Sequence, residues 1–481
     1  MTITLSVPLR WKSAQPDELA MLKDLQANIL KGHGRSHTMN LFLKFNIQKP
    51  NEVKSWLATL KITDALKQLN DTEIFKATKK SGGLVTLCLL SANGYRAIGA
   101  NGHAPANAAF AAGMGSRQAI LNDPLKQKWD THFRSEIHAL VILADDTAAL
   151  VKKAKQKLMA TLPAGVTLVG EEVGLGMRSL LSPGEGIEHF GYVDGRSQPL
   201  MLEEDIENER DNKDGILVWS PRFGLDTALV KDPGTPSPTG FGSYFVFRKL
   251  EENVKGFKTA EDKLANFLGL KGDDRERAGA MIVGRFENGS PIVLQRGDGI
   301  NNPVPNNFNY KDDPAASKCP FHGHIRKTNP RGESVKAGVV TEAQERSHIM
   351  ARRGITYGKR AKHPNDETLK KSEMPTGSVG LLFMAYQSNI ENQFEFTQST
   401  WANNKDFVSP IFVPGGSVTG IDPVIGQGPN GGPAAPAGQS CPVKWGGGIG
   451  APKKRSDFQG FVKMLGGEYF FAPSLSTLKS L

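Results

Sequence analysis

Cysteine is scarce in this chain: among 481 residues there are only Cys88, Cys319 and Cys441. So few and so widely spaced cysteines exclude a disulfide framework and are typical of a reducing compartment. Long apolar runs are also missing, since no segment approaches the roughly 18 apolar residues of a membrane-spanning helix. Residues 1–16 contain neither a long apolar core nor a small-residue cleavage site, so we expect no secretory signal, no membrane partner and a cytoplasmic location.

The distribution of charge argues against one further class of protein. Lys and Arg number 59 against 49 Asp and Glu, which gives a formal net charge of +10. The basic residues are scattered, whereas a nucleic-acid-binding protein usually gathers them on one element with interleaved aromatic residues. We therefore expect no nucleic-acid partner, and we interpret the charge as a solvated surface that aids solubility or attracts anionic substrates.

The length of the chain predicts more than one folding unit, because 481 residues exceed what one compact core usually holds. The first half alternates strand-like and helix-like patterns, with no Gly-rich phosphate loop after the first strand. This favours a ferredoxin-like α+β unit over a dinucleotide-binding fold. Helices are expected at 16–31, 50–60, 92–112 and 147–160, and strands at 38–47, 82–91, 138–146 and 165–171.

The second half repeats this order of elements, although the sequence itself shows no repeat. Strands are expected at 243–250, 377–387 and 466–474, and helices at 251–283, with a break near 270–272, and at 389–401. The predicted fold class is α+β, with two ferredoxin-like units whose antiparallel sheets carry helices packed on them.

The predicted units span residues 1–200 and 241–481, and 201–240 connects them. Within the connection, the charged segment 201–215 and the Pro/Gly-rich segment 231–240 are expected to be surface loops. A further Pro/Gly-rich stretch covers 423–450, and loops of this length are typical of sites that frame substrate access or of disordered segments.

Four short motifs carry residues suited to redox chemistry. They are GYVDG (191–195), SQP (197–199), CPFHGHIRKTNPR (319–331) and ARRGITYG (351–358). Together they supply an Asp on a glycine-flanked turn, histidines and arginines. A neutral imidazole can bind haem iron, a carboxylate can move a proton, and a guanidinium can stabilise an anionic oxygen. A haem peroxidase needs these three kinds of side chain.

In this order the motifs resemble those of the dye-decolorizing peroxidases, and the resemblance covers about residues 25–474. It implies a fold of the dimeric α+β barrel type, with one haem b per chain held mainly by the C-terminal half. It also implies reduction of hydrogen peroxide and oxidation of dyes, phenolics and similar one-electron donors, small or bulky, through a ferryl intermediate. Both a monomer and a homo-oligomer are compatible with it.

The resemblance assigns roles to residues within the motifs. His324 precedes the IRKTNPR run and corresponds to the iron ligand, with His322 as the alternative. A zinc site made by both histidines and Cys319 is disfavoured, because a second ligand pair at normal spacing is missing. Asp194, in the distal loop of the N-terminal unit, corresponds to the residue that moves the peroxide proton.

Arg352 corresponds to the cation that stabilises the departing charge and contacts the haem. Arg353 is the alternative, and neighbouring residues point in different directions, so we expect only one of them to face the iron. Leu381 and Phe383 lie two residues apart and share one face of a strand. By resemblance these two side chains form the apolar distal wall of the haem pocket.

A carboxylate that binds the proximal imidazole is also implied, and it would fix the ring and make it more electron-donating. Asp422, in GIDP (420–423), is the first candidate and Asp406 the second. Further candidates are open to a simpler explanation as surface charges or packing aromatics: Arg285 and Arg326 for the haem propionates, and Trp401 and Tyr357 for an electron route to bulky dyes.

Two other kinds of function remain open from the sequence. One is a haem-binding or haem-handling protein with little peroxidase turnover, against which the complete Asp, His and Arg set argues. The other is a nucleic-acid-binding or scaffold protein that uses its positive charge, against which the scattered Lys and Arg argue.

Overall fold

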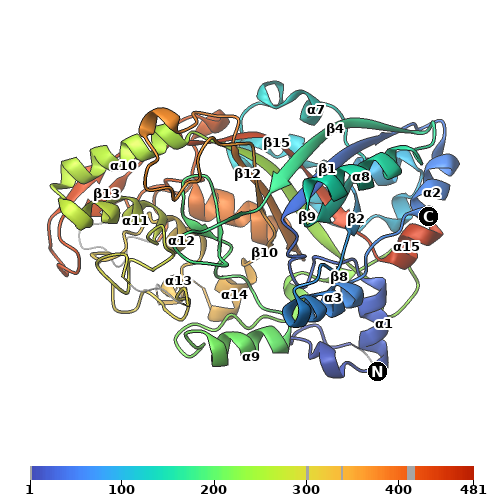
Figure 1. The fold of residues 1–481 in the computed structure, drawn as a ribbon, viewed down its shortest axis with the longest axis horizontal. Coiled ribbons are helices and arrows are strands. Elements are labelled where there is room, and N and C mark those ends of the chain that lie inside the picture. Colours follow the sequence, from blue (N-terminus) through green and yellow to red (C-terminus); the bar gives the residue numbers. More distant parts are fainter. Residues whose placement is uncertain (1–2, 300–302, 337, 339, 409–417) are drawn as a thin grey trace.

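Each half of the chain contributes four antiparallel strands to the centre of the molecule (Figure 1). The computed structural model describes residues 3–299, 303–336, 338, 340–408 and 418–481. In the first half the strands lie in the order β4-β1-β3-β2, and in the second half in the order β11-β12-β9-β15. Their bounds are β1 His37–Phe45, β2 Val85–Leu90, β3 Ala139–Asp145, β4 Val166–Leu175, β9 Phe241–Glu252, β11 Ile355–Tyr357, β12 Gly380–Gln387 and β15 Val462–Ala472.

The two sheets join edge to edge and close into one barrel. At one junction Tyr357 of β11 pairs with Gly174 of β4, and at the other Phe471 of β15 pairs with Leu90 of β2. Counted along the chain within each half, the strand order is 4-1-3-2, which is the order of a ferredoxin-like unit. The predicted α+β fold class is therefore confirmed, and the two predicted sheets form a continuous barrel.

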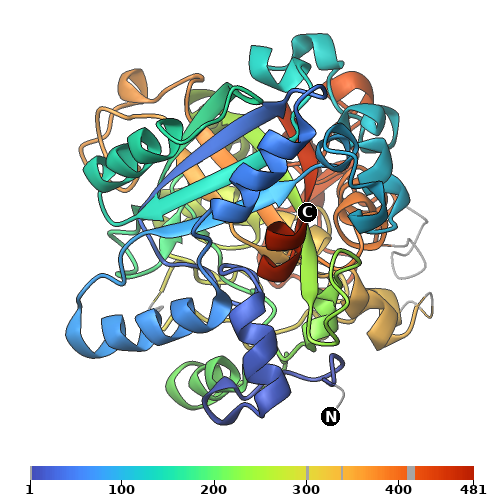
Figure 2. The ribbon, with the colours of Figure 1, turned by 90° about the vertical axis from the view of Figure 1, so that its right-hand side faces the viewer.

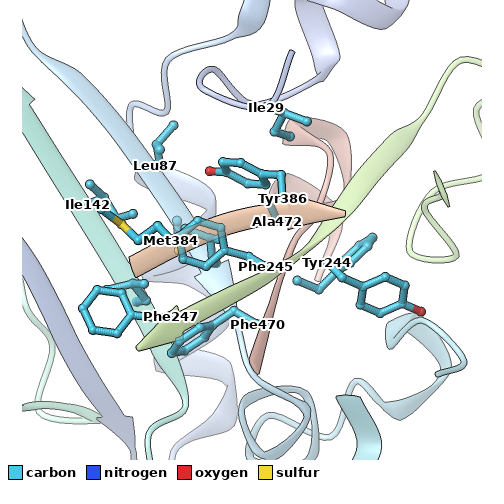
Figure 3. Packing of buried hydrophobic residues seen from close by; sticks show 14 of the residues in the cluster. Ile29, Leu87, Ile142, Tyr244, Phe245, Phe247, Met384, Tyr386, Phe470 and Ala472 are labelled. Carbon is cyan, nitrogen blue, oxygen red and sulfur yellow. The ribbon is translucent and has the colours of Figure 1, made fainter. Parts of the chain in front are cut away.

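Alternation along β12 separates the barrel core from a second, outward-facing surface. Leu382, Met384 and Tyr386 are buried in the barrel interior, and Figure 3 shows Met384 and Tyr386 there with Phe245 and other large apolar side chains. The residues that alternate with them, such as Leu381 and Phe383, point to the opposite face of the sheet. This outer face of the second-half sheet is where the candidate site lies.

Helices cover the outside of the barrel on both sides. In the first half, α2 (Pro50–Thr59) and α8 (Ala148–Met159) lie outside the strands, and α8 contacts β1 and β3 (Figure 2). In the second half, α10 (Val254–Leu268), α11 (Arg277–Val283) and α12 (His324–Thr328) lie together at the opposite end of the molecule (Figure 1).

Further elements lie between these, besides short 3-10 turns. The α-helices are α1 Pro16–Asp24, α3 Ala65–Thr78, α4 Ala92–Ala97, α5 Ala108–Ala112, α6 Gln118–Leu121, α7 Thr131–Arg134, α9 Glu203–Asn212, α13 Glu333–Lys336, α14 Glu342–Ser347 and α15 Leu475–Ser480, and the π-helices are η8 Glu391–Glu395 and η9 Thr397–Ala402. The strands are β5 Met177–Arg178, β6 Gly186–Ile187, β7 Val193–Asp194, β8 Val230–Lys231, β10 Ala351–Arg352, β13 Gln439–Pro442 and β14 Lys453–Ser456.

The expected surface loop at 201–215 is wrong over most of its length, because α9 occupies Glu203–Asn212. The helix lacks an apolar stripe, and of its residues only Ile206 and Glu209 are buried. Ion pairs hold it instead, and they connect it to four other segments: Arg10–Glu207, Lys31–Asp205, Arg222–Glu203 and Arg196–Glu209. Three acidic residues in its first turn also suit the positive end of the helix dipole.

Candidate functional site

A large cavity lies on the outer face of the second-half sheet. Phe383 and Arg248 stand opposite each other on β12 and β9, as do Leu381 and Leu250, and all four side chains line the cavity. It measures about 1720 Å³, counted together with its opening to solvent. Its wall combines apolar side chains with a histidine, an aspartate and several arginines, which suits a ligand that has both apolar and anionic parts.

His324 lies at the start of α12 and lines this cavity. Its Nδ1 atom is 2.8 Å from Oδ2 of Asp422, which is completely buried. A carboxylate only accepts hydrogen bonds, so Nδ1 carries the proton, and in the neutral form of the ring Nε2 has a free lone pair. Such a ring is oriented and polarised for binding a metal through Nε2.

The Asp422 carboxylate is held ionised in its buried position. Burial alone would raise its pKa, but the charge and hydrogen bond of His324 lower it below the usual value. The backbone N–H groups of Val424 and Ile425 also donate to Oδ1, at 2.8 and 3.0 Å. Asp406, the other candidate partner of the imidazole, is exposed and lies 3.7 Å from the ammonium group of Lys405. Of the two candidates, Asp422 alone is hydrogen-bonded to His324.

His322 points away from the cavity. The side chain is completely buried, and its Nε2 lies 3.7 Å from Sγ of Cys441. Burial, with a further contribution from the charge of Lys327, lowers its pKa to about 3. His322 is therefore a neutral core residue, and within the CPFHGHIRKTNPR motif His324 is the histidine that faces the open space.

Asp194 and Arg352 face the same cavity from two segments that meet beside it. Asp194 belongs to the short strand β7, and Arg352 to β10 at the edge of β12. Nη1 of Arg352 donates to Oδ1 of Asp194 at 3.2 Å, and both side chains stay about one third exposed, at 32% and 33%. Their charges also reach His324, so the three groups share one electrostatic environment.

The other motif residues hold this pair in place. Gln198, in SQP, accepts a hydrogen bond from the backbone N–H of Arg352 at 3.0 Å, while Nη2 of Arg352 donates to the carbonyl of Arg196. Arg353 turns the other way and donates to the carbonyls of Asn28 and Ile29. Arg353 thus connects the segment that follows α1 to the end of β10.

Within the described part of the chain, two buried arginines of the cavity wall have no carboxylate as a hydrogen-bond partner. Among the described residues, the hydrogen-bond acceptors of Arg285 and Arg331 are backbone carbonyls, the Ser197 hydroxyl and the Asn306 side chain. Burial, together with the repulsion of neighbouring arginines, lowers the pKa of Arg285 to about 9 and that of Arg331 to about 10. A pair of anionic groups would relieve this cost.

Arg326, the other sequence candidate for such a role, is already neutralised. It is completely buried and forms ion pairs with Asp313 and Glu333. The sequence alone did not identify Arg331 as a candidate for binding an anionic group, although this residue ends the same IRKTNPR run. Three basic residues share that run, and the sequence does not tell which of them lacks an acidic partner.

The two aromatic candidates differ in their relation to the cavity. The ring of Trp401 is buried and packs edge-on against that of His348, a cavity-lining residue, with 5.3 Å between centroids. Phe407 stacks on its other side at 5.4 Å. Tyr357 lies on β11, its hydroxyl is buried, and burial raises its pKa well above the usual value. Trp401 is thus the aromatic candidate in contact with a residue of the cavity wall.

Comparison with known proteins adds independent information. A family described as the DyP dimeric alpha+beta barrel domain matches residues 24–175. The chain is 48% identical over the full length of both proteins to the multifunctional dye peroxidase DyP2 of Amycolatopsis sp. (strain ATCC 39116 / 75iv2). It is 30% identical to the dye-decolorizing peroxidase msp1 of Mycetinis scorodonius, with 96% of this chain and 87% of that one covered.

Solved structures resemble the whole chain. The structure of DyP2 from Amycolatopsis sp. ATCC 39116 superposes with a TM-score of 0.92 at 47% identity and covers both chains completely. That of the DyP-type peroxidase AnaPX from Anabaena sp. gives a TM-score of 0.87 at 39% identity, with 98% of this chain and 96% of that one covered. The likeness therefore extends through the barrel, the cavity and the loops around it.

Proposed function

Since the chain belongs to the dye-decolorizing peroxidase family, a family of haem-dependent enzymes, we propose that it binds one haem b in the cavity described above and uses hydrogen peroxide to oxidise dyes and phenolic compounds. The observation that carries this proposal is the joint placement of His324, Asp194 and Arg352 in one cavity. When bound, haem supplies the iron that reacts with peroxide and passes oxidising equivalents to an electron donor.

The residues around the cavity suit haem b in three respects. His324 would ligate the iron through Nε2, with Asp422 holding the ring. Arg285 and Arg331 would pair with the two propionate carboxylates, which accounts for two buried guanidinium groups without an acidic partner. The apolar wall would be formed by the side chains of Leu381 and Phe383 against the ring. Most of the lining comes from the C-terminal half, so we place the haem there.

Asp194 and Arg352 would act on the peroxide. Oδ1 of Asp194 accepts from Arg352, and we assign the other oxygen, Oδ2, to moving the peroxide proton from one oxygen to the other. The guanidinium of Arg352 would stabilise the negative charge that develops on the departing oxygen. Its orientation is set by the hydrogen bonds to Gln198 and to the carbonyl of Arg196.

Bulky dyes would be oxidised at the protein surface by way of Trp401, which touches the cavity-lining His348. Small phenols would enter through the opening of the cavity. We also propose a cytoplasmic location, supported by three cysteines that are all buried and free. Among the described helices, none has the length and apolar character that crossing a bilayer requires.

The visible absorption spectrum of the purified protein, recorded before and after one equivalent of hydrogen peroxide, tests the proposed function. We expect the strong band of bound haem and its rapid change when peroxide is added. A haem band that does not respond to peroxide would indicate a haem carrier instead. Absence of the band after haem is supplied would contradict the haem assignment.

Replacing Asp422 with asparagine is expected to lower the affinity for haem by about 10–100-fold. Removing the hydrogen-bonding partner of a metal ligand usually has an effect of this size. The neutral amide makes the imidazole less electron-donating than the carboxylate does, so the reduction potential of the bound iron should rise. Redox titration of the purified protein measures this shift directly. The matched control is Asp406→Asn, which changes an exposed aspartate. If both variants had the same reduction potential, Asp422 would not be the residue that supports the iron ligand.

A further inference from the structure

A second acidic group, distinct from Asp194, lies in the wall of the cavity. Glu252, at the end of β9, and Glu188, just before the GYVDG motif, both line the cavity. Glu252 is 4% exposed, and its Oε2 atom is buried with no hydrogen-bond donor among the described residues. Neither carboxyl group has a part in the peroxide chemistry assigned above. A buried, unsatisfied carboxylate oxygen at a cavity wall needs an explanation.

The side chains of Glu188 and Glu252 lie within hydrogen-bonding reach of each other. Two ionised carboxylates have only acceptor atoms and repel each other, so such a contact is stable when the pair shares a proton. Glu188 is the better site for the negative charge, because the backbone N–H groups of Phe190 and Tyr192 donate to its two oxygens. Glu252 is therefore the member that carries the proton.

The surrounding charges favour one negative charge on the pair, not two. Lys258 of α10 and the guanidinium of Arg360 attract it, and the charge of Asp194 repels it. The charge of Glu252 also acts on Tyr357 of β11. Burial raises the pKa of Glu188 to about 7, and burial together with the charges of Glu188 and Asp194 raises that of Glu252 well above its usual value.

We propose that Glu188 and Glu252 form a proton-sharing carboxyl pair that stores a proton for the cavity and returns it to Asp194. This proposal rests on the proposed function, and it adds a proton source to the peroxide chemistry. The pair acts through Asp194, so both glutamates are supporting residues and do not touch the peroxide.

The reaction takes up protons inside the cavity, whereas the proton that each phenol releases on oxidation leaves the donor. Reduction of one hydrogen peroxide to two water molecules takes up two protons and two electrons, and the aromatic donors supply the electrons. The transfer of the peroxide's own proton by Asp194 provides neither of these two protons. In our proposal the O–H bond of Glu252 breaks, the Asp194 carboxylate gains the proton and delivers it to oxygen, and the pair then regains a proton from solvent.

Infrared spectroscopy can detect the stored proton without any turnover. We expect the wild type at about pH 6 to show C=O bands of protonated carboxyl groups that shift in heavy water. The Glu188 band should disappear as that group titrates near pH 7, while the Glu252 band remains. Glu252→Gln should lose the band that remains above pH 7, because Glu188 is then ionised and accepts from two backbone N–H groups. Glu188→Gln should keep a carboxyl band that no longer titrates near neutral pH.

The dependence of turnover on pH provides the second readout. At about pH 7 we expect Glu252→Gln to react roughly tenfold more slowly, a smaller loss than the ~10²–10⁴-fold that a primary acid–base group contributes. Near pH 4 the difference should vanish, because solvent then supplies protons directly. The matched control is Glu468→Gln, since Glu468 on β15 is a half-buried carboxylate that also accepts from two backbone N–H groups but does not line the cavity.

Stability gives a third measurement, with a defined sign. The folded pKa of Glu188 lies above its unfolded value, so the folded state holds a proton that the unfolded state releases. The contribution of Glu188 to stability should therefore be fully present below pH 4.5 and be lost as the pH rises through about 7. The Glu188→Gln/Glu252→Gln double variant should lose less stability over the same interval.

Two outcomes would overturn the proton store: a wild type without a titrating carboxyl band, or a Glu252→Gln protein with an unchanged pH profile. Failure of the proposed function would look different, because the wild type itself would then fail to respond to peroxide while the infrared band remained. If Glu252→Gln does not fold, Glu188→Gln carries the same two measurements, since either change removes the contact between the carboxyl groups.

Discussion

Replacing Asp194 with asparagine is expected to slow the reaction of the haem-loaded protein with hydrogen peroxide by about 10²–10⁴-fold. The amide has nearly the same size as the carboxylate but cannot take up a proton at neutral pH. It still accepts a hydrogen bond, so Arg352 should keep its place beside it. Haem content should therefore be unchanged, and rapid mixing with peroxide, followed by absorbance, measures the rate alone.

The matched control for this variant is Asp211→Asn. Asp211 also forms a close ion pair with an arginine, Arg210, but the pair is exposed on α9. Arg352→Leu should cause a loss of the same order as Asp194→Asn, and the double variant a loss well below the product of the two, because paired groups act as a unit. An Asp194→Asn protein that reacts at the wild-type rate would assign the proton transfer to another group.

Replacing His324 with alanine is expected to deprive the protein of haem. Residues that only support a metal ligand contribute about 10–100-fold to affinity, so loss of the ligand itself should exceed about 100-fold. Haem absorbance per mole of protein after gel filtration measures the loss. Added imidazole should restore part of the absorbance, because the space vacated by the side chain opens into the cavity.

His322→Asn is the control that distinguishes the two histidines of the motif. Its side chain contacts Cys441 in the core and does not line the cavity, so the variant should retain haem even if its stability falls. Loss of haem in His322→Asn together with retention in His324→Ala would reverse the assignment of the ligand.

The strands were predictable because each is a short apolar run bounded by turn residues. The expected strands at 138–146 and 377–387 correspond to β3 and β12, each within a few residues. The break expected near 270–272 separates α10 from the following helical turn. Pairings between the halves had no such signal, since each junction joins residues more than 180 positions apart through one register pair.

The N-terminal helix shows where periodicity misled the prediction. The spacing of apolar residues predicts a helix over 16–31, but α1 ends at Asp24. The side chain of Gln26 is buried and binds the carbonyls of Cys88 and Pro473, which requires the chain to leave the helix. Tertiary contacts thus override a local pattern that is correct for the first half of the segment.

At the site, the motifs predicted residue types and order, while the pairing of charges required the structure. Asp422 lies 98 residues from His324 along the chain, and spacing alone does not distinguish it from Asp406. The same holds for Arg331, whose lack of an acidic partner is visible only once Arg326 is seen bound to Asp313 and Glu333. Whether a buried charge has a partner depends on residues that are close in space, and a sequence motif does not show which residues these are.

The closure of the barrel has a consequence for synthesis of the chain on the ribosome. The strands of the first half are complete at Leu175, but their edge strands β4 and β2 find partners only in β11 and β15. The partner of β4 ends at Tyr357 and that of β2 at Ala472, so the β2 edge stays open until nearly the whole chain has emerged. Exposed edges of this kind favour pairing with other chains. We therefore expect nascent copies on one messenger RNA to be prone to exchanging strands until the barrel closes.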